Sequence, residues 1–94
     1  MNEKRIAMVI WALGVLDERR RHRDENQDRV IVPVGPDYLL IWHTGNILDI
    51  VRTEPAFGRN TVIGRLSLDS FEFDYRAEAV AITGMMMGFE QIDY

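Results

Sequence analysis

The fold is decided by residues 38–53, YLLIWHTGNILDIVRT, in which turn-forming residues separate two stretches rich in aliphatic and aromatic side chains. Gly45 and Asn46 both tolerate a positive φ angle. Two antiparallel strands joined by a two-residue turn at these positions are therefore predicted. This hairpin is the centre of the predicted sheet.

Neither face of the predicted hairpin is polar. The two-residue turn pairs Thr44 with Ile47 and Trp42 with Asp49, which fixes the side on which each side chain lies. One face carries Leu39, Ile41, His43, Leu48, Ile50 and Arg52, and the other carries Tyr38, Leu40, Trp42, Ile47, Asp49 and Val51. Strands of an antiparallel sheet with one solvent-exposed side alternate apolar with polar residues, and these strands do not. We therefore expect other parts of the protein to pack against both sides of the hairpin.

A helix and a strand are predicted before the hairpin. Asn2 is a suitable N-cap, and the helix should run from there to about residue 26. The first half of this helix is apolar nearly all round, which indicates burial on more than one side, and Trp11 is expected among its main contacts. Residues 30–34 form a short strand, which Pro33 confines to the edge of the sheet because proline cannot donate a backbone hydrogen bond.

A second helix is predicted near the C-terminus. Asp74 is a fair N-cap, and the helix should stop at Met87 because Gly88 sits where a left-handed C-terminal cap is favoured. Residues 88–94 then form a short extended tail or edge strand. The alternative interpretation is a strand through the methionines of residues 80–88.

The predicted fold class is α+β. Residues 61–68 form the fourth strand, and a bulge or turn follows at 69–70, where the phase of the apolar positions slips. Residues 1–94 are therefore expected to form a single domain. Its elements are an N-terminal helix, a four-stranded antiparallel meander, a C-terminal helix and, in one version, a short final strand.

The composition indicates a cytoplasmic protein without a cofactor. The chain has 94 residues, a net charge of −4 and no cysteine, which excludes disulfides and thiolate metal ligands and fits a reducing compartment. Its longest apolar run, residues 6–16, is much shorter than the roughly 20 residues that a membrane-spanning helix needs. We therefore expect a cytoplasmic location and no contact with a membrane.

The sequence contains no recognisable catalytic or metal-binding pattern. In the predicted register His43 and Asp49 lie on opposite faces, so they should not form a base and an orienting partner. His22 lies among arginines, whose charge opposes metal binding. Neither a nucleophile elbow nor a phosphate-binding glycine motif is present. We predict that the protein is not an enzyme and holds no metal.

A run of arginines suggests an alternative function. Side chains of this kind contact phosphates, which would make the protein a nucleic-acid-binding module. At helical spacing, however, they point in different directions, and acidic residues flank them on both sides. A solvated helix surface is the favoured interpretation of this run, which comprises Arg19, Arg20, Arg21 and Arg23.

Acidic residues gather towards the C-terminus. From Asp69 onward, six acidic residues accompany a single arginine. If the phenylalanines at 71 and 73 point inward, the acidic residues between them point outward together. The resulting ridge of negative charge would attract a basic surface. Its predicted members are Asp69, Glu72, Asp74 and Glu78.

Tyr38 and Trp42 mark a second predicted contact surface. If both helices cover the other side of the sheet, the side with Tyr38, Leu40, Trp42 and Val51 presents aromatic and aliphatic groups to solvent. Exposed patches with an aromatic centre and a charged rim are typical of protein interfaces. If each helix takes one side, this patch vanishes and the domain closes on itself.

These observations predict a protein-binding module, in the form of a homodimer or a hetero-complex. Its sharper version is an inhibitor or adaptor whose acidic ridge occupies a basic, nucleic-acid-handling surface of the target. In size and charge, though not in any alignable motif, the chain resembles small phage-encoded inhibitors such as anti-CRISPR proteins. The alternatives are a chaperone-like dimer that binds a hydrophobic segment with Tyr38 and Trp42, the nucleic-acid-binding module, and an enzyme with a polar pocket around His43.

Overall fold

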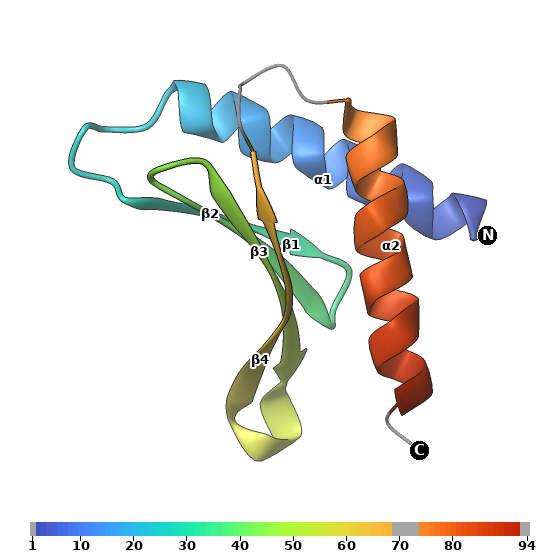
Figure 1. The fold of residues 1–94 in the computed structure, drawn as a ribbon. Helices are drawn as coiled ribbons and strands as arrows, with labels where there is room; N and C mark the ends of the chain where they lie inside the picture. The colour runs from blue at the N-terminus through green and yellow to red at the C-terminus, as the bar shows by residue number, and fades with distance from the viewer. Residues whose placement is uncertain (1, 69–73, 93–94) are drawn as a thin grey trace.

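The computed structural model describes residues 2–68 and 74–92, and it has the predicted α+β architecture (Figure 1). Two long helices and four strands account for most of these residues. The elements are α1 (Glu3–Arg21), β1 (Arg29–Val34), β2 (Tyr38–His43), β3 (Ile47–Glu54), the short 3-10 helix η1 (Pro55–Phe57), β4 (Arg59–Ser67) and α2 (Tyr75–Ile92).

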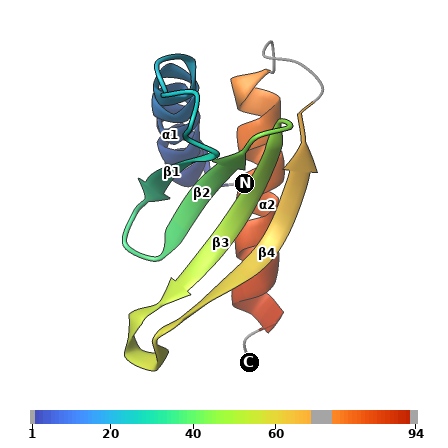
Figure 2. The ribbon, with the colours of Figure 1, turned by 90° about the vertical axis from the view of Figure 1, so that its left-hand side faces the viewer.

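The four strands form an antiparallel meander in the order β1-β2-β3-β4. Both helices lie on the same side of this sheet, with α1 against β1 and α2 against β4, and the helices also contact each other. Figure 2 looks onto the opposite side of the sheet, where the strands stand in front of the helices. One face of the sheet is therefore covered by helices, and the other is not.

The turn between β2 and β3 holds three residues, Thr44, Gly45 and Asn46, and the predicted two-residue turn was wrong. Gly45 and Asn46 both have positive φ angles, of 95° and 59°, which is the conformation that these two residue types were predicted to tolerate. Asn46 fixes the turn, because its side chain accepts a hydrogen bond from the Trp42 indole at 3.3 Å and its carbonyl accepts one from the Leu68 amide at 2.7 Å.

The extra loop residue moves every β3 side chain to the opposite face from the one predicted. Trp42 now pairs with Leu48 and His43 with Ile47. The face against the helices carries the side chains that form the sheet's part of the core, which are Val30, Val32, Val34, Tyr38, Leu40, Trp42, Leu48 and Ile50.

Tyr38 and Trp42 belong to this core, and the predicted exposure of their face was wrong. Their residues are 6% and 2% exposed, because the two helices pack over them. The helices supply the apolar side of the contact with Ile6, Val9, Leu13, Leu16, Ala79, Ile82 and Met86. The face that the helices leave uncovered is therefore the opposite face of the sheet, not the one with Tyr38 and Trp42.

The N-terminal ends of both helices are capped as predicted. The Asn2 side chain accepts a hydrogen bond from the Arg5 amide at 3.1 Å, and the Asp74 carboxylate accepts bonds from the amides of Arg76 and Ala77 at 3.0 and 3.3 Å. The C-terminal ends differ from the prediction. Helix α1 stops at Arg21 rather than near residue 26.

Helix α2 continues through Gly88 to Ile92, so neither the predicted stop at Met87 nor the final strand is correct, and residues 80–88 are helical. The side chain of Glu90 explains the extra turn. It pairs with Arg5 of α1 at 2.8 Å and accepts a hydrogen bond from the Tyr38 hydroxyl, which ties the end of the helix to the rest of the fold.

A register shift lies between Ile50 and Val51, opposite residues 62–64 of β4, where the sequence had not indicated one. The bulge or turn predicted at 69–70 lies outside the described residues. In the described ranges, neither helix is long and apolar enough to cross a membrane.

Candidate binding surface

The uncovered side of the sheet is the candidate site, and we call it the open face. The strand register aligns its residues in three rows across the four strands. These rows are Arg29, His43, Ile47 and Ser67; Ile31, Ile41, Asp49 and Arg65; and Pro33, Leu39, Val51 and Val62.

The open face is aliphatic at one end. The row of Pro33, Leu39, Val51 and Val62 has no polar side chain. The residues of the two outer strands are the most accessible, with Ile31 43% and Val62 54% exposed. The residues of the inner strands shield one another in part, and Val51 is buried. The result is a shallow apolar band with exposed margins.

A cluster of three charged or titratable side chains lies next to this band. The Asp49 carboxylate accepts hydrogen bonds from Arg65, at 2.6 Å from Nε and 3.2 Å from Nη2, and pairs with the Nε2 atom of His43 at 2.9 Å. The predicted separation of His43 and Asp49 was wrong, because the longer turn places both on the open face. The cluster joins β2, β3 and β4 at one point.

The electrostatics of the cluster keep Asp49 ionised. The hydrogen bonds from Arg65 hold the pKa of the Asp49 carboxyl below its ordinary value, and the bond to His43 acts in the same direction against the effect of burial. Because the two partners already engage both carboxylate oxygens, the group organises the surface and orients the imidazole of His43.

The charge of the open face differs in sign from that of the whole protein. Arg29 and Arg65 are exposed, whereas Asp49, the acidic residue among the rows described above, is 5% exposed and covered by its partners. The accessible charge of this face is therefore positive, although the chain carries a net charge of −4.

The predicted contact residues Tyr38 and Trp42 are buried, and their contacts lie within the chain. The Tyr38 hydroxyl donates to Glu90 and accepts a bond from Arg52 at 3.2 Å. Burial and the neighbouring Glu90 carboxylate raise the pKa of this phenol. The Trp42 ring lies beneath the guanidinium groups of Arg23 and Arg20, whose central carbons are 4.6 and 5.9 Å from the ring centroid.

The predicted acidic ridge is only partly described. Asp69 and Glu72 lie outside the described residues. Asp74 is exposed but is engaged as the N-cap of α2, and Glu78 is half-buried in the first turn of that helix. A contact between this ridge and a basic partner stays a prediction.

Each of the four arginines of the predicted nucleic-acid surface is engaged within the chain. Arg20 is buried beside Asp17, and Arg21 pairs with the same carboxylate at 3.1 Å. Arg23 donates to the Arg20 carbonyl at 2.9 Å, and Arg19 donates to the Ile31 carbonyl at 3.3 Å. Each of these side chains therefore has an intramolecular role.

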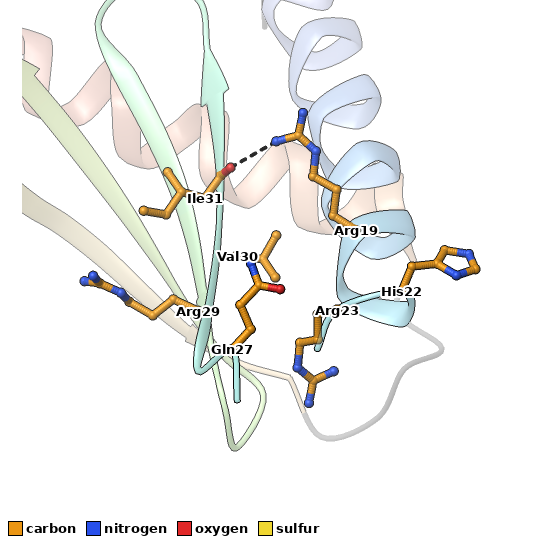
Figure 3. Close-up of a pocket in the computed structure, with 7 residues that line it drawn as sticks. All are labelled: Arg19, His22, Arg23, Gln27, Arg29, Val30 and Ile31. Atoms are coloured by element: carbon orange, nitrogen blue, oxygen red, sulfur yellow. Dashed lines mark hydrogen bonds between the residues drawn. The ribbon is translucent and has the colours of Figure 1, made fainter. Parts of the chain in front are cut away.

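A cavity of about 480 Å³ lies between the end of α1 and the start of β1 (Figure 3). Its lining includes Arg19, His22, Arg23 and Arg29. Figure 3 shows that the His22 and Arg29 side chains point away from the space between helix and strand, Arg29 on the side opposite to α1. The cavity is therefore less basic than the types of its lining residues suggest.

The carboxylate of Asp17 is the buried centre of the second charged cluster. It accepts hydrogen bonds from Arg20 and from the Tyr75 hydroxyl, the latter at 2.6 Å, so it joins the two helices. Burial raises the pKa of Asp17, but the bonds from Tyr75 and Arg20 outweigh that effect, and the pKa lies below its ordinary value. This cluster is structural.

No protein-family model, curated protein or solved structure matched the chain in the comparisons. Within residues 2–68 and 74–92 there is also no group of three or more His, Asp or Glu side chains that could hold a metal ion. The candidate site is therefore derived from geometry alone.

Sequence reasoning missed the residues of the open face. Ile31, Val62, Arg29 and Arg65 were not predicted as contact residues. The alternation of β1, in which Arg29, Ile31 and Pro33 point to one side, was a signal for this face. It could not show which side the helices would leave uncovered, because that depends on contacts distant in the sequence.

Proposed function

We propose that this protein is a non-enzymatic protein-binding module that uses the open face of its sheet. The observation that carries the proposal is the position of α1 and α2 on the same side, so that no helix covers the aliphatic row of Pro33, Leu39, Val51 and Val62, whose outer members Pro33 and Val62 are exposed. On a sheet face that is exposed to solvent, polar side chains would be expected at these positions. A shallow apolar band with a charged margin fits another protein surface.

The charges on the open face indicate the chemistry of the partner. Arg65 lies in the row next to the apolar band and Arg29 in the row beyond it, and the Asp49 carboxylate that pairs with Arg65 is covered. A protein with an apolar patch edged by carboxylates would match both features. This partner would sit on the open face, while the acidic ridge predicted at 69–78 would remain for a basic part of the same target.

A single-stranded nucleic acid fits the open face less well. Such ligands need aromatic side chains on which bases stack. The described rows of the open face contain none, because Tyr38 and Trp42 lie on the other side. For the same reason, a chaperone-like role that used these two rings would need them to leave the core.

A module of this kind acts by occupying a surface of its partner. An inhibitor blocks the partner's own ligand, and an adaptor holds a third component beside it. Both roles require one specific contact face and no reaction, and the proposal covers both.

The proposal is tested by affinity capture with matched variants. Wild-type protein, Val62→Lys, Ile31→Lys and the control Ala81→Lys are immobilised and exposed to an extract of the cells that encode the protein. Val62 and Ile31 lie on the open face, and Ala81 is exposed on α2. A protein that binds the wild type and the control, but neither open-face variant, is then purified, and its affinity is measured by calorimetry.

We expect each open-face lysine to weaken binding by about tenfold or more, because it buries a charge in an apolar contact. The Ala81→Lys control should bind as the wild type does. Added salt should weaken binding through Arg29 and Arg65. A partner that is lost with Ala81→Lys and retained by both open-face variants would refute the proposal.

A further inference from the structure

Helix α1 carries a second uncovered apolar surface on the side that faces away from the sheet. Trp11 is 68% exposed, so its predicted role as a main core contact was wrong. Val15 beside it is half-buried, whereas Met8, although exposed, lies against Gly35 in the turn between β1 and β2. A large aromatic ring at the centre of such a stripe is the residue type that most often anchors a protein interface.

A groove runs beside Trp11. It has a volume of about 540 Å³ and is lined by Ile10, Trp11, Gly14, Val15, Glu18, Arg19 and Tyr75. Gly14 forms its floor, and a methyl group built on this glycine would meet no atom within 4 Å. The fold of one chain therefore does not require a glycine at this helical position, although glycine weakens a helix relative to alanine. It does leave room for a helix of a second chain to approach closely at this position.

Two residues of opposite charge lie symmetrically about Trp11 on the same side of α1. Lys4 lies seven residues before Trp11 and Glu18 lies seven residues after it, which is about two helical turns in each direction. Both residues are exposed on the same side of α1 as the tryptophan. If a second α1 packs antiparallel with Trp11 opposite Trp11, Lys4 of each copy meets Glu18 of the other.

We propose that two copies of this chain associate through antiparallel α1 helices centred on Trp11. The contact is isologous, so each favourable pair occurs twice. Gly14 allows the helices to approach, and Trp11 fills the groove of the second copy. Because the stripe is small compared with the interfaces of permanent dimers, the dimer should form reversibly at micromolar concentrations.

The dimer would be independent of the open face, which lies on the other side of the sheet. It would present two open faces on opposite sides of a central helix pair. Two tethered binding surfaces strengthen attachment to a repetitive target without any new contact.

Sedimentation equilibrium over a wide range of concentrations tests the proposal. The wild type should pass from monomer to dimer. Trp11→Lys should stay a monomer at every concentration, and Val62→Lys on the open face should dimerise as the wild type does. Circular dichroism verifies that each variant keeps its fold, which we expect because both side chains are exposed.

Charge reversal tests the antiparallel arrangement itself. Lys4→Glu and Glu18→Lys each place like charges opposite one another twice, and each should raise the dissociation constant about tenfold. The double variant Lys4→Glu/Glu18→Lys should return it to within about threefold of the wild type. Gly14→Ala should weaken the dimer while leaving the monomer folded.

Three results would overturn the proposal. The first is a wild type that remains a monomer throughout the concentration range. The second is a dimer that survives Trp11→Lys and is lost in Val62→Lys, which would place the contact on the open face. The third comes from a Trp42→Phe variant, in which Trp11 is the remaining tryptophan: emission that is shifted to the blue and independent of concentration would show that the chain covers its own groove.

Discussion

At the scale of single residues, three carboxylates hold the molecule together across its elements. Asp49 joins three strands, Asp17 joins the two helices, and Glu90 joins α2 to Arg5 and to the sheet. The pKa of each group is lowered: for Asp49 mainly by Arg65, and for Asp17 and Glu90 by hydrogen bonds that outweigh burial. Most of these links were not visible in the sequence, because they join residues that are far apart in the chain, whereas the pair of Asp17 with Arg21 follows from their helical spacing.

These lowered pKa values predict a loss of stability in acid. A carboxyl whose pKa is lower in the folded chain than the value of about 4 in the unfolded chain stabilises the fold above that value. The stabilisation is lost as the pH falls through the folded pKa. For Asp49, the variant Asp49→Asn should lower the free energy of unfolding by about 1 kcal/mol at pH 7, because His43 and Arg65 lose a charged partner and solvent screens the exposed Arg65.

Urea denaturation at neutral and at acidic pH measures this effect. The difference between Asp49→Asn and the wild type should shrink in acid, where the wild-type carboxyl is also neutral. A difference that is the same at both pH values would show that the lowered pKa of Asp49 has another origin. Ser67→Asn, an exposed change on the same face, serves as the control and should leave stability unchanged at both pH values.

At the scale of elements, the sequence predicts which segments are helices and strands better than it predicts how they meet. Cap residues and turn glycines identified both helix starts and the hairpin. The hairpin register was missed by one residue, because a two-residue and a three-residue loop both satisfy the positive φ angles of Gly45 and Asn46. The choice between them rests on the contacts of Asn46 with Trp42 and Leu68, the second of which is remote in the sequence.

Two glycines give opposite predictions at this scale. A methyl group on Gly64 of β4 would collide with the sulfur of Met85, where α2 packs on the sheet, so Gly64→Val should lower the free energy of unfolding by about 1 to 3 kcal/mol. A methyl group on Gly14 of α1 meets no atom, so Gly14→Ala should raise it by up to about 1 kcal/mol. Urea denaturation at concentrations that favour the monomer measures both. Equal effects of the two changes would contradict the packing of α2 against β4.

At the scale of the whole molecule, the number of elements indicates that two helices leave part of a four-stranded sheet uncovered, but not which part. The face that remains open follows from the register and from the contacts that place α1 and α2 together on the side of Tyr38 and Trp42. The open face with Ile31, Val62, Arg29 and Arg65 could therefore be found only from the assembled structure. Its use as a contact surface is the central claim for the function.

Photo-crosslinking in living cells tests that claim most directly. A photoreactive amino acid replaces Val62 on the open face in one version of the protein and Ala81 on α2 in another, and the cells are irradiated. We predict that the Val62 version forms a covalent adduct with one specific protein and that the Ala81 version does not. The absence of any adduct at Val62, together with a specific adduct at Ala81, would contradict a binding role for the open face.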